Sequence, residues 1–174
     1  MKKLFLFIFL LSPLSGFSQF GLEVGFGSSK AKVSEGNVSV SSDAYSVFAA
    51  GLVYNFSMSE QFKLETGISL SSVKVNGERS NGWGIPLVAK LYPKPENGLH
   101  IRAGVGYGAT LEDVDTTVVK KGAFSAGFGL GYDIDDKFTI VAEYSTQLSN
   151  SAGSDLDGVE IKGSAFGVSL QYFF

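Results

Sequence analysis

The sequence predicts an all-β fold: an eight-stranded antiparallel up-and-down transmembrane β-barrel with short periplasmic turns and longer extracellular loops. Three observations carry this prediction. Eight runs alternate large apolar residues with small or polar ones at period 2, and the connections between them alternate between short and long. Large aromatic residues also gather near both ends of the runs, as they do where a barrel wall meets the two interfaces of a bilayer.

The start of the chain has the layout of an export signal. Two lysines precede an unbroken apolar run over residues 4–11, and small residues precede Gln19. The run is too short to span a bilayer, which takes about 20 apolar residues. We therefore predict a signal peptide over residues 1–18, cleaved before Gln19, and a single barrel domain over residues 19–174.

Composition limits the function classes. Two lysines and no acidic residue fall within residues 1–18, so the net charge of −3 for the whole chain becomes −5 for residues 19–174. An acidic chain without a basic cluster is a poor match for nucleic acid, whose phosphates require a positive patch. The chain has no cysteine, which excludes disulfides and thiolate metal sites. We also expect no cofactor.

The first three predicted strands place their large apolar residues at even positions. The strands cover residues 20–27, 45–56 and 61–74. Their apolar faces comprise Phe20, Leu22, Val24 and Phe26; Phe48, Leu52, Tyr54 and Phe56; and Phe62, Leu64, Ile68 and Leu70. A run of about 9–11 residues crosses the hydrocarbon core when the strand is tilted.

The fourth and fifth strands use odd positions, and the last three return to even ones. These strands cover residues 83–92, 98–110, 122–133, 137–148 and 163–174. Their apolar faces include Trp83, Ile85, Leu87 and Leu91; Leu99, Ile101, Val105 and Tyr107; Phe124, Phe128, Leu130 and Tyr132; Phe138, Ile140 and Tyr144; and Phe166, Val168, Leu170, Tyr172 and Phe174. Pro86 interrupts the fourth strand, where a closed barrel needs a backbone donor, and a bulge or a wet lumen would be required.

The connections alternate in length along the chain. Short ones lie near residues 57–60, 93–97 and 134–136, and long polar ones near residues 28–44, 75–82, 111–121 and 149–162. This alternation, with both termini on the short-turn side, is typical of outer-membrane barrels. The first long loop is rich in serine, with Gly36 and Asn37 at its centre. The alternation continues through Val38 and Val40, which predicts strands that extend outside the membrane and offer edges for β-augmentation.

The direction in which the apolar face points distinguishes two barrels. A soluble lipocalin-type barrel would turn this face inward. The opposite face, however, is dominated by glycine, as at Gly104, Gly106 and Gly108, which suits a tight lumen and poorly suits a solvated exterior. We predict that the apolar face meets lipid.

The last nine residues carry a resemblance to a known class. Apolar residues occupy the last position and every second one before it, at Phe166, Val168, Leu170, Tyr172 and Phe174. This pattern resembles the small eight-stranded outer-membrane barrels of Gram-negative bacteria, the class of outer membrane protein X, Ail and the OmpA barrel, and the PorT-like group. The resemblance implies an integral outer-membrane location and a final strand that is read by the barrel-assembly machinery.

Six charged residues fall on the predicted lumen face. They are Glu23, Lys63, Glu65, Lys90, Arg102 and Glu143. Buried charges persist when they are paired, so we interpret the six as a salt-bridged plug that fills the interior. A narrow polar path is the alternative interpretation.

Catalytic and metal-binding residues are weakly indicated. His100 is the single histidine, and the Ser–His spacing of lipid A deacylases is absent around it. The external loops hold Glu112, Glu160 and four aspartates that could hold a divalent cation or join a lipopolysaccharide network: Asp113, Asp115, Asp155 and Asp157. We expect solvated loop charge, and neither a metal site nor a catalytic one.

The sequence thus favours a non-enzymatic, monomeric scaffold that displays surface loops for adhesion, envelope stability or docking of a secretion or assembly partner. A narrow pore for ions or small solutes is the second hypothesis, and a lipid A-modifying enzyme the third. The expected partners are outer-membrane lipid or lipopolysaccharide, the barrel-assembly machinery during biogenesis, and a surface or secretion-system protein.

Overall fold

The computed structural model describes residues 18–75 and 78–174, and within them nine β-strands and one short 3₁₀-helix. The signal peptide predicted over residues 1–18 lies outside the described residues, apart from Ser18. The strands are β1 (Ser18–Glu35), β2 (Val38–Ser41), β3 (Tyr45–Ser57), β4 (Phe62–Val75), β5 (Glu78–Leu91), β6 (Leu99–Thr110), β7 (Gly122–Asp133), β8 (Phe138–Gln147) and β9 (Val159–Phe173), and the 3₁₀-helix is η2 (Pro95–Asn97). No helix in these residues is long and apolar enough to cross a lipid bilayer.

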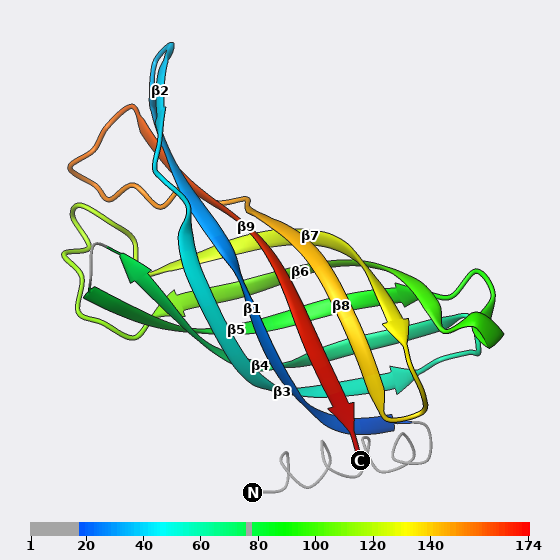
Figure 1. The fold of residues 1–174 in the computed structure, drawn as a ribbon. Helices are drawn as coiled ribbons and strands as arrows, with labels where there is room; N and C mark the ends of the chain where they lie inside the picture. Colours follow the sequence, from blue (N-terminus) through cyan, green and yellow to red (C-terminus); the bar gives the residue numbers. More distant parts are fainter. Residues whose placement is uncertain (1–17, 76–77) are drawn as a thin grey trace, which may run out of the picture.

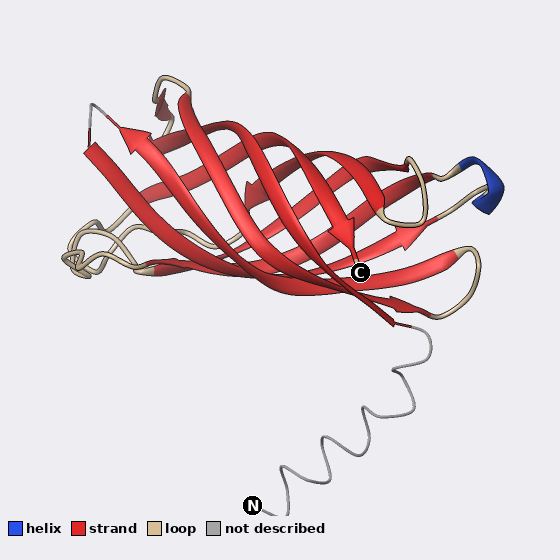
Figure 2. Ribbon diagram, turned by 60° about the horizontal axis from the view of Figure 1, so that its bottom comes forward, coloured by secondary structure: helices blue, strands red, loops and turns tan. Residues whose placement is uncertain are grey.

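Eight of the strands close into the predicted antiparallel barrel. Each pairs with its neighbour along the chain, and β1 also pairs with β9, from Gly21 opposite Phe173 to Glu35 opposite Val159. Closure leaves no open edge in the wall, as the hydrocarbon core demands. The ribbon views show strands tilted around a single cylinder (Figures 1 and 2). We call the end with the short connections and the C-terminus the turn end, and the other the loop end.

The apolar face points outward, as predicted. Phe26 is 71% exposed and Phe128 65%, whereas Lys90 is 1% exposed inside the barrel. Aromatic rings contact one another near both ends of the wall: Tyr107 and Phe124, 5.1 Å apart, at the loop end, and Phe138 and Tyr172, 5.0 Å apart, at the turn end. The soluble alternative, with an apolar centre and solvated lumen charges, is excluded by this arrangement.

Two strands extend further toward the loop end than predicted, since β5 begins at Glu78 and β9 at Val159. β1 runs to Glu35 and pairs with β2, which confirms the strand extension predicted from the alternation through Val38 and Val40. The loop predicted over residues 75–82 is therefore wrong for most of its length, because β4 and β5 pair up to Val75 and Glu78. Apolar alternation ends where the wall leaves the lipid, but backbone pairing continues beyond it, so the pattern underestimates strand length.

The ninth strand, β2, forms a hairpin with the end of β1. We call residues 32–41 the hairpin extension. A two-residue turn at Gly36 and Asn37 joins the strands, with Gly36 in the left-handed conformation (φ 55°) that glycine adopts readily. The same stretch of β1 pairs with β9 on its other side. Figure 1 shows this hairpin projecting beyond the other loops at its end of the barrel.

Pro86 is accommodated without a bulge. The β4–β5 pairing is interrupted between Thr66–Leu87 and Ser69–Gly84, but the register is the same on both sides of the gap. The Thr66 hydroxyl donates to the Pro86 carbonyl at 2.8 Å and replaces part of the lost ladder. The bulge considered from the sequence is therefore wrong.

Candidate functional site

A layer of buried charge crosses the lumen in the turn-end half of the barrel. Glu65 on β4 lies at its centre. Its Oε2 is 2.5 Å from the Lys90 ammonium, and its Oε1 accepts hydrogen bonds from Arg102 Nη2 at 2.7 Å and Gln171 Nε2 at 3.2 Å. All four side chains are at most 3% exposed. We call these four residues the charged layer.

The register of the strands explains why a carboxylate is needed there. Lys90 on β5 lies directly opposite Arg102 on β6. Directly opposed side chains in an antiparallel pair point to the same face with their Cβ atoms about 5 Å apart, and two like charges in this arrangement repel. Glu65, which faces them from β4, bonds to both cations and offsets the repulsion.

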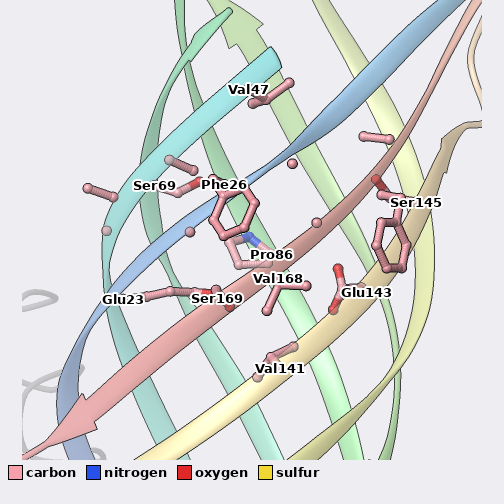
Figure 3. A pocket seen from close by; sticks show the side chains of 18 of the residues that line it. Glu23, Phe26, Val47, Ser69, Pro86, Val141, Glu143, Ser145, Val168 and Ser169 are labelled. Carbon is pink, nitrogen blue, oxygen red and sulfur yellow. The ribbon is translucent and has the colours of Figure 1, made fainter. Parts of the chain in front are cut away.

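Two further acidic residues line the lumen beyond the charged layer. Glu143 on β8 lies with its Oε2 3.5 Å from Arg102 Nε and is partly exposed. Glu23 on β1 accepts a hydrogen bond from the Ser169 hydroxyl at 2.5 Å and forms no ion pair with a residue that the structure describes. Both contribute to the lining of a cavity of 270 Å³ on the loop-end side of the layer. Figure 3 shows their side chains around this cavity, with Pro86 on its wall.

Lys63, the sixth predicted lumen charge, lies directly opposite Lys90 but forms no ion pair with Glu65. Its ammonium stacks over the Tyr92 ring, 4.7 Å from the centroid. It lines a separate cavity of 380 Å³ at the turn end, together with Asp133 and Thr139. The structure therefore joins Glu65, Lys90, Arg102 and Glu143, and leaves Glu23 and Lys63 outside that set of contacts.

A second group, which the sequence interpretation missed, lies between the charged layer and the turn end. The Tyr92 hydroxyl donates to Asp133 Oδ2 at 3.0 Å, and the Thr139 hydroxyl donates to Asp133 Oδ1 at 2.7 Å. The Tyr92 ring packs on His100 with 4.6 Å between centroids. Burial, strengthened by the Asp133 carboxylate, raises the pKa of the Tyr92 phenol. The signal that could have predicted this group was the position of its residues on the lumen-facing side of the alternation.

His100 is enclosed by this group. Its side chain is fully buried, and its Nδ1 lies 3.3 Å from the Gly98 carbonyl oxygen and 3.7 Å from Asp133 Oδ1. Its Nε2 has no hydrogen-bond partner among the described residues and packs against the backbone at Gly131. The nitrogen that would accept a proton from a nucleophile therefore contacts no hydroxyl group that the structure describes.

The acidic loop residues bond mostly to neighbours in their own loops. Asp115 Oδ1 accepts from the hydroxyl and the backbone N–H of Thr117, and these bonds hold the pKa of that carboxyl below its usual range. Asp113 lies 3.9 Å from Lys121, Asp155 accepts from Ser154, and Asp157 is exposed. Within residues 18–75 and 78–174, no three His, Cys, Asp or Glu side chains are grouped to hold a metal ion.

Alternate residues of the closing strand, from Phe166 to Phe174, face outward, whereas Gln171 and Phe173 are buried in the lumen. Phe166 is 55% exposed and Phe174 68%. The centroid of the Phe174 ring lies 6.0 Å from that of Phe20 and 5.3 Å from that of Tyr172. The C-terminal residue therefore contacts both the first strand and the last strand at the turn end. The role of this strand in assembly stays a prediction.

Comparison with known proteins gives a family match and similar solved structures over most of the chain. The model of the outer membrane protein beta-barrel domain family matches residues 4–174. The solved structure of Ail, the attachment invasion locus protein of Yersinia pestis, is similar over 90% of this chain and 99% of its own, with 15% identity and a TM-score of 0.52. Neisserial surface protein A is similar over 88% of this chain and 97% of its own, with 12% identity and a TM-score of 0.50. Among curated proteins, none matches this sequence.

Proposed function

This chain belongs to the outer membrane protein beta-barrel domain family, and from that premise we propose that it is a non-enzymatic outer-membrane scaffold that presents its hairpin extension to a protein partner. The turn end then faces the periplasm and the loop end the exterior. The observation that carries the proposal is the free edge of β2, which pairs with β1 on one side and with no strand of the described residues on the other.

The charged layer favours the scaffold hypothesis over the pore hypothesis. The buried charged layer separates the cavity of 270 Å³ from the cavity of 380 Å³ at the turn end. Its four side chains are at most 3% exposed, and beside them Val88, Val141 and Phe173 are also buried. An ion crossing the barrel would have to break the contacts of Glu65 with Lys90 and Arg102. We expect no reproducible unitary conductance in planar bilayers, and a conductance that changes in Glu65→Gln or Arg102→Gln would instead favour the pore.

The enclosure of His100 supports a non-enzymatic role. A hydrolase that uses this histidine needs it within reach of both a nucleophile and the outer leaflet. Here it is fully buried in the periplasmic half of the lumen. We expect the mass of lipid A to be the same in cells with and without the protein, and a mass change abolished by His100→Ala would revive the enzyme hypothesis.

The free edge of β2 is unprotected. Exposed edge strands are commonly guarded by charged residues, proline or a bulge, which prevent another chain from pairing with them. β2 reads Val38-Ser-Val-Ser41, with Val38 68% and Val40 66% exposed, and carries neither charge nor proline. Such an edge offers backbone donors and acceptors for one more strand.

One face of the hairpin extension is apolar and open. Val40 lies opposite Val33, and Val33 lies opposite Ile161 on β9, so the three side chains line the same face. Val38 and Val159 continue that face on either side of Glu35. An extended segment with alternating apolar residues would pair with the β2 edge and extend this valine face, which is the recognition mode of β-augmentation. We therefore commit to an extended polypeptide segment of a partner protein as the occupant.

A synthetic peptide tests this mode without knowledge of the partner. The full-length protein in lipid nanodiscs is titrated with an alternating valine–threonine octapeptide, and amide hydrogen exchange is followed in β2. We expect new protection of the amides of Ser39 and Ser41, which point to the free edge, because Ser42 donates to Ala31 of β1 and donors alternate along a strand. The matched control is the same peptide with every backbone nitrogen methylated, which keeps the side chains but removes the donors on both edges, and it should not protect them.

Two results would overturn the proposal. Equal protection by both peptides, or by neither, would remove pairing at the β2 edge as the mode of binding. Protection of β2 without peptide, together with a dimer in solution, would make a second copy of this chain the occupant. Val40→Lys places a charge on the apolar face at this edge and should weaken peptide protection, while Ser59→Lys, at the turn end, should leave it unchanged.

A further inference from the structure

The cavity of 270 Å³ on the loop-end side of the charged layer contains a buried donor that the protein leaves unused. Arg102 contributes to the lining of this cavity and is 3% exposed. Its Nη2 donates to Glu65 at 2.7 Å and its Nε to Glu143 at 3.5 Å, but its Nη1 has no hydrogen-bond partner among the described residues. A buried guanidinium nitrogen without an acceptor costs free energy, and an acceptor bound in the cavity would remove that cost.

Two carboxylates beside this cavity have spare capacity to accept hydrogen bonds. Glu143 is 35% exposed, and its contact with Arg102 uses one oxygen, Oε2, while its Oε1 lies beside Gly127. Glu23 accepts from the neutral Ser169 hydroxyl and pairs with no cation of the described residues. Figure 3 shows both side chains beside the cavity. With Glu65, three carboxylates and one guanidinium line it, so a positive group of a ligand would be attracted there.

The register of the strands brings the unused donor and the unused acceptor together. Gly129 on β7 lies directly opposite Arg102 of β6 on one side and Glu143 of β8 on the other. Because Gly129 has no side chain, the side chains of the two flanking strands reach each other across it. Nη1 of Arg102 and Oε1 of Glu143 therefore belong to two groups already in contact. A ligand that satisfies both needs an acceptor and a donor close together.

A small α-amino acid has this combination on a single carbon. Its carboxylate accepts charge-assisted hydrogen bonds from a guanidinium, and its ammonium donates three hydrogen bonds to carboxylates. Val47, Pro86, Val88 and Val141 also line the cavity and suit a short apolar side chain. Pockets for drug-sized ligands have volumes of about 300–1,000 Å³, so a cavity of 270 Å³ suits a smaller molecule.

The cavity is reached from the loop end and closed toward the periplasm. It shares Ser145 and Ala165 with the cavity of 400 Å³ nearer the loop end. On its other side the charged layer fills the lumen with side chains that are at most 3% exposed. A ligand would therefore enter and leave on the same side, which makes this a capture site and not a path across the membrane.

We propose that this cavity binds a small apolar α-amino acid from the external medium, with its carboxylate on Arg102 and its ammonium on Glu143 and Glu23. The site uses the lumen of the barrel and is independent of the β2 edge. This proposal and the proposed function can therefore fail separately.

The test titrates the full-length protein in phosphatidylcholine nanodiscs with L-valine by isothermal titration calorimetry. Two matched probes each lack one group: isovalerate has the carboxylate without the ammonium, and isobutylamine the ammonium without the carboxylate. The variants are Glu143→Gln, which removes a carboxylate, and Ala49→Phe, which fills the cavity without a change of charge. The matched control is Glu60→Gln, which removes the same charge from an exposed residue at the turn end. Heat-modifiable migration on gels verifies that each variant is folded.

We expect wild type and the Glu60→Gln control to bind L-valine equally, and Ala49→Phe not to bind it. Glu143→Gln should bind it about tenfold to a hundredfold more weakly, the effect of losing a hydrogen bond between charged groups. Isovalerate and isobutylamine should each bind wild type at least about tenfold more weakly than L-valine does.

Three results would overturn the proposal. The first is no binding of L-valine by wild type at millimolar concentration. The second is equal binding of L-valine and either probe, which would reduce the site to one for a simple anion or a simple cation. The third is equal binding of L-valine by Glu143→Gln and the control.

Discussion

The two halves of the lumen differ in how they fill the same cylinder. The periplasmic half is closed by large polar side chains that bond to one another: Glu65, Lys90, Arg102, Gln171 and the group around Asp133. The external half is lined mostly by glycine, serine and alanine and holds cavities of 270 and 400 Å³, whereas the cavity of 380 Å³ at the turn end is separated from them by the charged layer. The number of strands is the same in both halves, so side-chain size and pairing alone decide whether the barrel is closed.

Because of this difference, we expect the stability of the barrel to depend more on side chains in the periplasmic half than on those in the external half. Buried charges in the periplasmic half depend on one another, so removal of one partner leaves the others unpaired in a dry environment. In the external half the side chains are small or partly exposed, and changes there should be tolerated. The external end can therefore carry variable loops without loss of the barrel.

The difference between the two halves is tested most strongly by neutralising one carboxylate in each half. Glu65→Gln leaves Lys90 without its ion-pair partner and Arg102 with only the longer contact to Glu143, and should lower the free energy of unfolding by about 3–5 kcal/mol. Glu23→Gln, in the external half, removes a carboxylate that bonds to Ser169, and should cost much less. Urea unfolding in phospholipid vesicles, followed by the fluorescence of Trp83, measures both. Similar losses would show that the two halves are equally dependent on charge.

A pair of glycine substitutions tests packing in the same two halves. A methyl group at Gly131 would overlap the buried His100 ring, whereas at Gly84 the nearest atom would be the Ser69 hydroxyl oxygen at 3.4 Å. Gly131→Ala should cost about 1–3 kcal/mol through overpacking. Gly84→Ala should be neutral or stabilise by less than about 1 kcal/mol, because alanine restricts the unfolded chain. The same urea titration decides, and a costly Gly84→Ala would contradict an open external lumen.

The stability that Tyr92 contributes in the periplasmic half should also fall at alkaline pH. Its pKa is raised in the folded protein, so the folded state holds the phenolic proton more tightly than the unfolded state does. Its contribution to stability is complete below the unfolded pKa of about 10 and is lost as the pH rises further, by about 1.4 kcal/mol per pH unit. The stability difference between wild type and Tyr92→Phe should therefore be constant up to about pH 9 and shrink above pH 10. A constant difference to pH 11 would mean that Tyr92 ionises freely.

The smallest expected effect lies beside Pro86, which lines the cavity of 270 Å³. Thr66→Val removes the hydroxyl that donates to the Pro86 carbonyl and should cost about 1 kcal/mol. In a Pro86→Ala background the ladder can be completed, so the same change should cost less. A double-mutant cycle measures this coupling. Additive costs would show that the Thr66 bond does not compensate for the proline.

Much of the fold followed from the periodicity of the sequence. The eight strands, the outward apolar face and the strand extension at the first loop were predicted. The long connection over residues 75–82 was wrong, and the starts of β5 and β9 were missed, because polar residues such as Lys74 end the apolar pattern while backbone pairing continues. The accommodation of Pro86 needed coordinates as well, since a proline in a sequence does not reveal whether a neighbouring hydroxyl can bond to its carbonyl.

The sequence by itself determined which face of each strand every residue occupies, because a period of two assigns faces without knowledge of the neighbouring strands. It therefore placed all six charges in the lumen. Only the tertiary structure decided that Glu65 meets Lys90 and Arg102 while Glu23 and Lys63 do not, and that Lys74 and Arg79 lie opposed on the outer wall. Those contacts depend on the stagger between strands and on the closure of β1 with β9, which are set by hydrogen-bond register around the whole barrel and leave no mark within any single strand.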